Sequence, residues 1–213
     1  MFEQFYEKLE STGIVPVVVL ERIEDAVPLA HALMAAGMRA AEVTFRTPCA
    51  AECIAAMAAA EPQMCVGAGT VLTIENVRHA MSSGAQFVVS PGYDDAIVSC
   101  CIELGLPILP GTVTPSEVCA AKARGLNVTK FFPAEQYGGL KTIDALAAPF
   151  GSHRFMPTGG ISTSNVEDYL TDSNVIACGG TWMVKPELFA DGDFSRVTEA
   201  ALEAMRIVER IRC

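Results

Sequence analysis

A single lysine interrupts one of the most apolar stretches of the chain. Lys130 lies within Val128–Pro133, two residues before Phe132, so both side chains project from the same face of a strand. A lysine near a strand end commonly keeps its stem packed and its ammonium in water. The strand and helix pattern described below predicts a closed barrel, however. In such a barrel a strand faces only the interior or the helix layer, and burial favours the neutral amine. Because a neutral lysine amine attacks carbonyl carbons, we interpret Lys130 as a Schiff-base nucleophile.

Polar and apolar side chains alternate in a second run, Ala40–Arg46. Glu42, Thr44 and Arg46 therefore share one face of the predicted strand, and the apolar residues between them share the other. A structural ion pair at the mouth of a barrel is the alternative interpretation. Beside a reactive lysine, a carboxylate can move protons to and from a carbinolamine or an enamine carbon. A guanidinium can hold a substrate carboxylate through two parallel hydrogen bonds, so the run supplies the other groups that a Schiff-base aldolase needs.

Two Gly-Gly pairs follow later strand candidates, each beside a threonine. They are Thr158-Gly159-Gly160 and Gly179-Gly180-Thr181. Phosphate groups in (β/α)8 barrels often bind at the loops after strands 7 and 8, where glycines expose backbone N–H groups. Either pair alone would indicate a tight turn, but the two together predict an anion site. A further segment, Gly67–Thr70, lacks the dinucleotide fingerprint spacing and suggests a close approach of the backbone to a ligand.

These residues lie near the ends of apolar runs that recur about every 20 to 25 residues, each followed by an amphipathic stretch. The strand candidates are Ile14–Leu20, Ala40–Arg46, Met64–Thr70, Phe87–Pro91, Pro107–Gly111, Val128–Pro133, Arg154–Gly159 and Val175–Gly179. Helices are expected to begin near Glu24, Cys49, Thr73, Asp94, Pro115, Gly139, Thr163 and Phe194. A short helix over Phe2–Ser11 precedes them and could cover the bottom of the barrel. The pattern predicts an α/β fold, a single (β/α)8 TIM barrel domain over residues 1–213, with its chemistry at the carboxyl ends of the strands.

Local signals support the predicted helices. Thr114 and Glu117 flank Pro115 in a capping-box pattern. Glycines follow four of the helical stretches, where a left-handed terminus is expected, at Gly37, Gly84, Gly105 and Gly125.

Composition narrows the functional classes. With 213 residues, 51% hydrophobic and 19% charged, the chain suits one compact domain and is too apolar for disorder. A formal net charge of −10 argues against nucleic-acid or anionic-membrane partners. Residues 1–10 lack the pattern of a signal peptide, and every apolar run is far shorter than the roughly 20 residues that cross a bilayer. We therefore expect a cytoplasmic protein with a small-molecule substrate.

Cysteine and histidine spacing argues against a metal site. The 8 cysteines include no C-x-x-C pair and are expected to be buried small hydrophobes in a reducing compartment. His31, His79 and His153 all lie away from the predicted strand ends, whereas a metal-dependent aldolase needs several imidazoles that converge on one ion. Surface or packing roles are expected for the three histidines, and no metal is predicted.

Taken together, the chain resembles the 2-keto-3-deoxy-6-phosphogluconate (KDPG) and 4-hydroxy-2-oxoglutarate (KHG) aldolases of class I. The resemblance runs over nearly the whole chain, from Gly13–Val17 to Gly179–Trp182. Its most specific motifs are Glu42–Thr47, Gly67–Leu72, Ser90–Gly92, Lys130–Glu135 and Pro157–Ile161.

The resemblance implies a role for each site residue. Lys130 would be the Schiff-base lysine and Glu42 the general acid/base. Four residues would surround the pyruvate end: Arg46 and Thr70 would hold its carboxylate, and Pro91 and Phe132 would wall the pocket. The phosphorylated end would bind to Thr158, Gly159, Gly160, Gly179, Gly180 and Thr181. Thr181 is a departure, since family members often carry serine there.

The family also implies a homotrimer, no metal or organic cofactor, and a place in the Entner–Doudoroff pathway of carbohydrate metabolism. The expected reactions are cleavage of KDPG to pyruvate and glyceraldehyde 3-phosphate, and of KHG to pyruvate and glyoxylate. The sequence leaves three alternatives open. They are an aldolase for the galactonate-derived epimer, a phosphosugar isomerase or epimerase barrel, and a barrel that only binds a phosphorylated metabolite.

Overall fold

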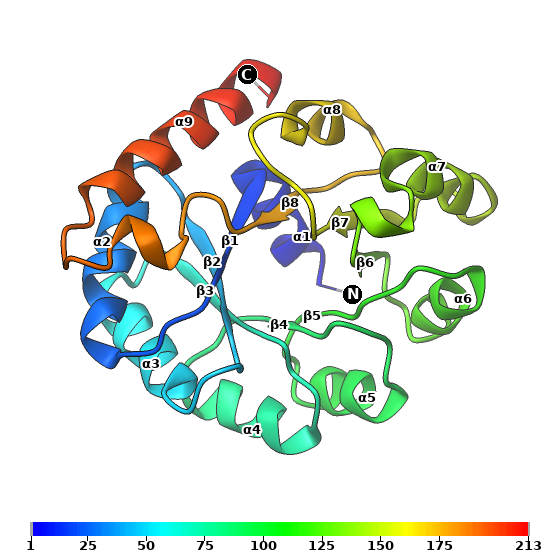
Figure 1. The fold of residues 1–213 in the computed structure, drawn as a ribbon. Coiled ribbons are helices and arrows are strands. Elements are labelled where there is room, and N and C mark those ends of the chain that lie inside the picture. The colour runs from blue at the N-terminus through cyan, green and yellow to red at the C-terminus, as the bar shows by residue number, and fades with distance from the viewer. Residues whose placement is uncertain (1, 213) are drawn as a thin grey trace.

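A computed structural model describes residues 2–212, in which parallel strands form the centre and helices surround them (Figure 1). The strands are β1 (Ile14–Val18), β2 (Ala40–Thr44), β3 (Cys65–Gly69), β4 (Val88–Val89), β5 (Ile108–Leu109), β6 (Val128–Phe131), β7 (Arg154–Pro157) and β8 (Cys178–Gly180). The α-helices are α1 (Glu3–Thr12), α2 (Ala26–Ala35), α3 (Ala50–Ala60), α4 (Ile74–Ser82), α5 (Asp95–Glu103), α6 (Pro115–Ala123), α7 (Gly139–Phe150), α8 (Val166–Thr171) and α9 (Ser195–Arg212). Three short 3-10 helices, which the sequence pattern did not predict, are η1 (Ile23–Asp25), η2 (Glu135–Tyr137) and η3 (Pro186–Leu188).

The strands form two parallel ladders. One is a six-stranded sheet in the order β5-β4-β3-β2-β1-β8, which makes a half-barrel, and the other pairs β6 with β7. Single bridges lie between the two ladders: Gly111 with Lys130 on one side, and Phe155 with Val175 and Thr158 with Gly179 on the other. The α/β fold with alternating strands and helices is as predicted.

The predicted continuous ladder of eight strands differs from this six-plus-two arrangement. β5 has only two residues and is enclosed by Pro107 and Pro110. Proline has no N–H to donate, so the ladder between β5 and β6 is reduced to one bridge. β8 also begins later than expected, at Cys178, and Val175 contributes only an isolated bridge.

The predicted helix ends are confirmed. Thr114 and Glu117 form both halves of a capping box at the start of α6. Gly37, Gly84, Gly105 and Gly125 all have positive φ angles at helix termini.

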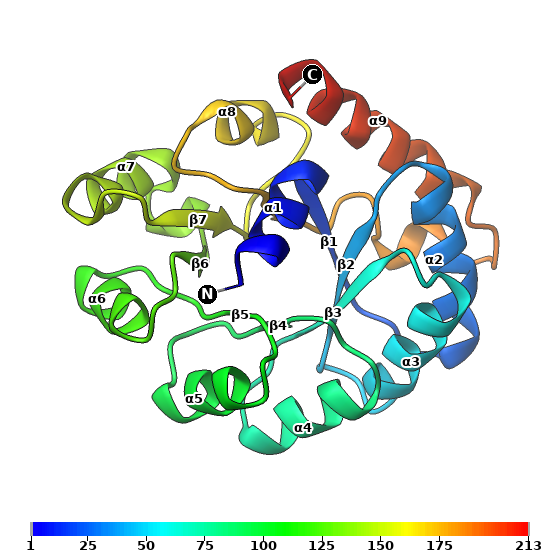
Figure 2. The ribbon, with the colours of Figure 1, turned by 180° about the vertical axis from the view of Figure 1, so that it is seen from behind.

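Two hydrophobic clusters fill the molecule. The larger cluster lies between strands and helices, and the smaller one joins the first residues of β2, β3 and β6 to Phe5, Tyr6 and Leu9 of α1. Seen from behind, α1 lies across one end of the strands, as the sequence predicted (Figure 2). The interior is thus closed by apolar packing at the amino-terminal ends of the strands, which leaves the carboxyl ends for polar side chains. Within residues 2–212, no helix combines the length and apolar character needed to cross a bilayer.

Candidate active site

Lys130 and Glu42 meet inside the ring of strands. Lys130 comes from β6 and is 5% exposed, while Glu42 comes from β2 and is 0% exposed. Lys130 Nζ donates to Glu42 Oε1 at 3.3 Å and lies 5.1 Å from the centroid of the Phe132 ring. Such a buried pair is tolerated only because each charge has its partner, so removal of either group leaves the other uncompensated. We refer to Lys130 and Glu42 as the amine end of the site.

Two glycines of β3 make room for the side chains of Glu42 and Phe87. Thr44 is opposite Gly69 and Glu42 is opposite Gly67 in the register between β2 and β3. A Cβ atom at Gly69 would overlap the Glu42 carboxylate, and one at Gly67 would overlap the Phe87 ring. The sequence suggested that this segment lets the backbone approach a ligand, whereas in the structure these two glycines admit protein side chains.

Glu42 retains an open position for a polar ligand atom. Its Oε2 is buried and has no hydrogen-bond partner among the described residues. Because buried polar atoms are almost always paired, an unpaired carboxylate oxygen here suits a substrate hydroxyl or a water molecule. The neighbouring Thr44 is already satisfied, since its hydroxyl donates to the Val18 carbonyl at 3.0 Å.

Arg46 and Thr70 contact each other just after the carboxyl ends of β2 and β3. Arg46 follows the end of β2 and is exposed, and its Nε donates to Thr70 Oγ1 at 3.1 Å. Thr70 has a φ of +55°, a left-handed conformation that a β-branched residue rarely adopts. The tip of β3 thus presents a hydroxyl to the arginine, and the guanidinium can take an anionic group arriving from solvent.

Pro91 packs against Gly111, the residue that is bridged to Lys130. A Cβ at Gly111 would overlap the Pro91 carbonyl, and Gly111 forms the bridge to Lys130. Phe132, half-buried, lies next to the amine on the other side. Of the two predicted wall residues, Phe132 contacts the lysine directly, and Pro91 contacts Gly111, the bridge partner of Lys130.

The two Gly-Gly pairs also lie side by side, and we refer to Thr158–Gly160 and Gly179–Thr181 as the glycine end. Thr158 bridges to Gly179, where a Cβ would overlap the Thr158 hydroxyl. That hydroxyl is buried and has no partner among the described residues. Gly159 and Gly160 have φ angles of +98° and +79°, which side chains rarely permit, and Thr181 is exposed.

Three residues that the sequence reasoning missed hold this loop in place. The carbonyls of residues 158, 159 and 160 accept, in order, from Ala134 N–H at 2.8 Å, Glu135 N–H at 3.1 Å and Asn165 Nδ2 at 3.0 Å. Asn165 Oδ1 also accepts from the Ser162 N–H at 2.9 Å. An asparagine shortly after a Gly-Gly pair is a recognisable loop signal, but the backbone donors carry no sequence signal.

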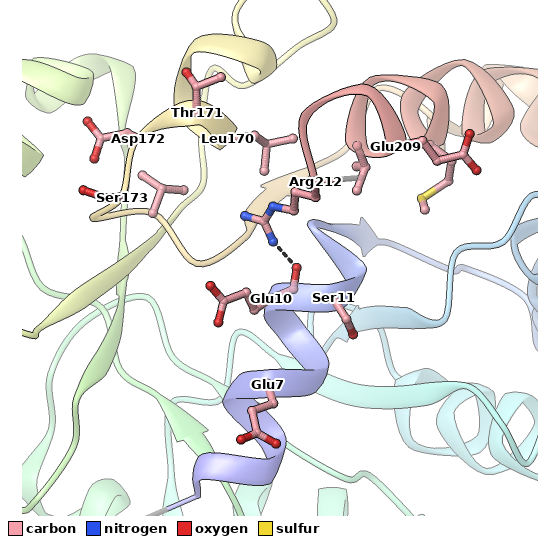
Figure 3. A pocket seen from close by; sticks show the side chains of 12 residues that line it. Glu7, Glu10, Ser11, Leu170, Thr171, Asp172, Ser173, Glu209 and Arg212 are labelled. Atoms are coloured by element: carbon pink, nitrogen blue, oxygen red, sulfur yellow. Dashed lines mark hydrogen bonds between the residues drawn. The ribbon is translucent and has the colours of Figure 1, made fainter.

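A pocket of about 690 Å³ lies at the other end of the molecule, between α1, α8 and α9 (Figure 3). Its lining includes the acidic side chains Glu7, Glu10, Asp172 and Glu209, and Arg212 points into it with a hydrogen bond to the Glu10 carbonyl. Arg212 is also engaged by the Ile176 carbonyl at 2.8 Å, so its charge holds the end of α9. The pocket borders the segments that precede β1 and β8, far along both strands from their carboxyl ends.

The histidines and thiols have mostly structural environments. Among the described residues, no three His, Cys, Asp or Glu side chains converge on a potential metal position. Burial raises the pKa of the Cys53 and Cys101 thiols to about 12, as expected for inert packing residues. Cys119 differs from the expectation because it is exposed on α6.

Comparison with known proteins agrees with this geometry. The family model described as KDPG and KHG aldolase matches residues 5–200. A 2-dehydro-3-deoxy-phosphogluconate aldolase of Treponema pallidum is 49% identical over 203 residues, which cover 95% of this chain and 97% of the relative. The KHG/KDPG aldolase of Escherichia coli K12 is 44% identical over 200 residues, or 93% of this chain and 94% of the relative.

A solved structure gives the same result. KDPG aldolase from Legionella pneumophila, crystallised with pyruvate captured at low pH as a covalent carbinolamine intermediate, is 35% identical. It superposes with a TM-score of 0.89 over 92% of this chain and 96% of its own. On these matches, which span most of both chains, the protein belongs to the KDPG and KHG aldolase family.

Proposed function

We propose that this protein is a class I aldolase that cleaves KDPG to pyruvate and glyceraldehyde 3-phosphate, and KHG to pyruvate and glyoxylate. The observation that carries the proposal is the buried Lys130 amine, 3.3 Å from a buried carboxylate oxygen of Glu42. A proton that moves from the ammonium to Glu42 leaves a neutral amine in a site with little water, which is the form that attacks a carbonyl.

Lys130, Glu42, the substrate and a water molecule account for every step of the proposed reaction. The amine nitrogen adds to C2 of the 2-oxo acid, and water leaves as Glu42 supplies a proton to the departing hydroxyl. Glu42 then takes the proton of the C4 hydroxyl, the C3–C4 bond breaks, and its electron pair moves into the protonated imine. The aldehyde departs, Glu42 protonates C3 of the enamine, and hydrolysis of the imine releases pyruvate and the amine.

The remaining site residues bind the two ends of the substrate in this proposal. Arg46 and Thr70 hold the carboxylate next to the keto carbon, while Pro91 and Phe132 exclude water around the amine. Thr158, Gly159, Gly160, Gly179, Gly180 and Thr181 receive the phosphate. The unpaired Thr158 hydroxyl supports an anion there, since it is buried and free to donate.

We also propose that the two ladders close through their single bridges into an eight-stranded barrel, and that residues 1–213 act as one domain. The bridges from Gly111 to Lys130 and from Thr158 to Gly179 support closure, because each joins the edge of one sheet to the edge of the other. A cytoplasmic homotrimer in the Entner–Doudoroff pathway is proposed from family membership. Light scattering of the purified protein tests the trimer.

Borohydride trapping tests the function directly. Incubation with pyruvate and borohydride is expected to add the mass of a reduced pyruvate adduct to the peptide that contains Lys130. A phosphosugar isomerase, or a barrel that only binds a metabolite, would show no adduct. Turnover measured separately with KDPG and with its galactonate-derived epimer then decides the C4 configuration that the enzyme accepts.

A further inference from the structure

A buried polar network lies behind Lys130, on the face of β6 opposite the amine. Thr129 Oγ1 is 2.7 Å from Thr112 Oγ1 and 2.9 Å from His153 Nε2. Thr112 is 1% exposed, and Thr129 and His153 are both 0% exposed. The Thr129 hydroxyl thus links three buried side chains and restricts their arrangement, while His153 Nδ1 has no hydrogen-bond partner among the described residues.

The network lies where the sheet is weakest. β5 and β6 belong to different ladders, and the single bridge between them includes Lys130 itself. The Lys130 N–H donates to the Pro110 carbonyl at 3.0 Å, and the Thr112 N–H donates to the Lys130 carbonyl at 2.8 Å. Both backbone groups of the lysine therefore depend on Pro110–Thr112, and the Thr112–Thr129 contact ties that segment to β6.

His153 extends the network to β7. It directly precedes this strand, which pairs with β6 through Thr129 and Phe155 and through Lys130 and Met156. Burial, helped by the nearby Lys122 ammonium, lowers the pKa of His153 to about 4, so the imidazole is neutral at physiological pH. The network is thus uncharged and can stay buried without a counter-ion.

We infer that Thr112, Thr129 and His153 are positioning residues that set the place of the Lys130 amine against Glu42. They tie the segment after β5, whose ladder with β6 is reduced to one bridge, to the continuous ladder of β6 and β7, so that Lys130 and Glu42 meet at 3.3 Å across the interior. The inference rests on the proposed function, because it concerns the step in which the amine attacks the keto carbon.

Two substitutions at Thr129 test the network. Thr129→Val keeps the shape of the side chain but removes its hydroxyl, whereas Thr129→Ser keeps the hydroxyl. Thr198→Val is the control, since its hydroxyl donates to the Ala32 carbonyl at 3.3 Å and joins α9 to α2, away from β6. The rate of pyruvate trapping by borohydride on the Lys130 peptide is measured with kcat and KM, at a temperature where circular dichroism shows every variant folded.

Thr129→Val is expected to slow trapping and kcat by about 10- to 100-fold, the scale reported for small misplacements of reacting groups, with KM little changed. Thr129→Ser should recover most of the rate, and Thr198→Val should match the wild type. A merely structural role would lower the Tm of Thr129→Val and leave its trapping rate intact, which would overturn the inference, as would a serine variant as slow as the valine variant. Absence of an adduct in the wild type would instead refute the proposed function itself.

Discussion

The amine end and the glycine end of the candidate site are built in different ways. At the amine end, side chains of two strands meet in the interior, with Lys130 5% exposed and Glu42 0% exposed. The glycine end combines Gly179 and Gly180, buried in β8, with loop residues, of which Gly160 and Thr181 are exposed. In the proposed reaction, the bond-making groups are therefore held where water is excluded and electrostatic interactions are strong. The far end of the substrate would meet more exposed loop residues, which can change without disturbing the chemistry.

This contrast predicts that substitutions at the amine end reduce catalysis for every substrate, whereas substitutions at the glycine end reduce it only for phosphorylated ones. Four variants test this difference between the two ends, in order of decreasing expected loss of activity.

Lys130→Ala should abolish turnover of both KDPG and KHG, because no other group can form the imine. The variant should also be less stable, since the buried Glu42 carboxylate loses its partner. Steady-state assays and borohydride trapping measure the loss, and circular dichroism verifies folding. Lys141→Ala, at an exposed position on α7, is the control and should remain active. Full activity in Lys130→Ala would exclude the imine mechanism.

Glu42→Gln should slow turnover by about 10²- to 10⁴-fold, the usual contribution of a general acid–base group. The amide keeps the shape of the side chain but cannot accept the C4 hydroxyl proton. Rates for both substrates should fall together, while the Lys130 peptide should still be labelled slowly with pyruvate and borohydride. Unchanged kcat would assign the proton transfers to another group.

Gly69→Ala should reduce kcat by about 100-fold, as expected when a reacting group is displaced by a fraction of an ångström to an ångström. The added Cβ would overlap the Glu42 carboxylate and push it away from Lys130. Gly92→Ala is a matched control, because a Cβ there meets no heavy atom within 4 Å. The comparison uses kcat for both substrates, and a Gly69 variant with normal kcat would show that the placement of Glu42 is not critical.

Asn165→Ala tests the glycine end. Loss of the hydrogen bonds to the Gly160 carbonyl and the Ser162 N–H should loosen the loop. Since one hydrogen bond contributes about 1 kcal/mol, KM for the phosphorylated substrate should rise roughly fivefold. KM for KHG should not change. Asn174→Ala, which removes a hydrogen bond to Asp144, is the control, and equal losses with both substrates would contradict the division of the site.

The order of strands and helices could be predicted from local sequence. The alternation around Glu42 and Lys130 identifies an interior face, and the capping box at Thr114 and the glycines after the helices mark their boundaries. These features depend on residues close together in the chain, whose periodicity and φ preferences are visible in the sequence. The same local patterns placed the short strands β4 and β5 correctly but predicted them too long.

Contacts between residues far apart in the chain could not be predicted from local sequence. Lys130 and Glu42 are 88 positions apart, and their contact depends on which strands face each other across the interior. Two further features depend on residues that are distant in the sequence. They are the need for glycine at position 69 and the network of Thr112, Thr129 and His153. Local sequence indicated which groups could react and on which face of a strand they lie. The packing of the strands determined which of them meet, because a single-residue change in register would turn each side chain to the opposite face.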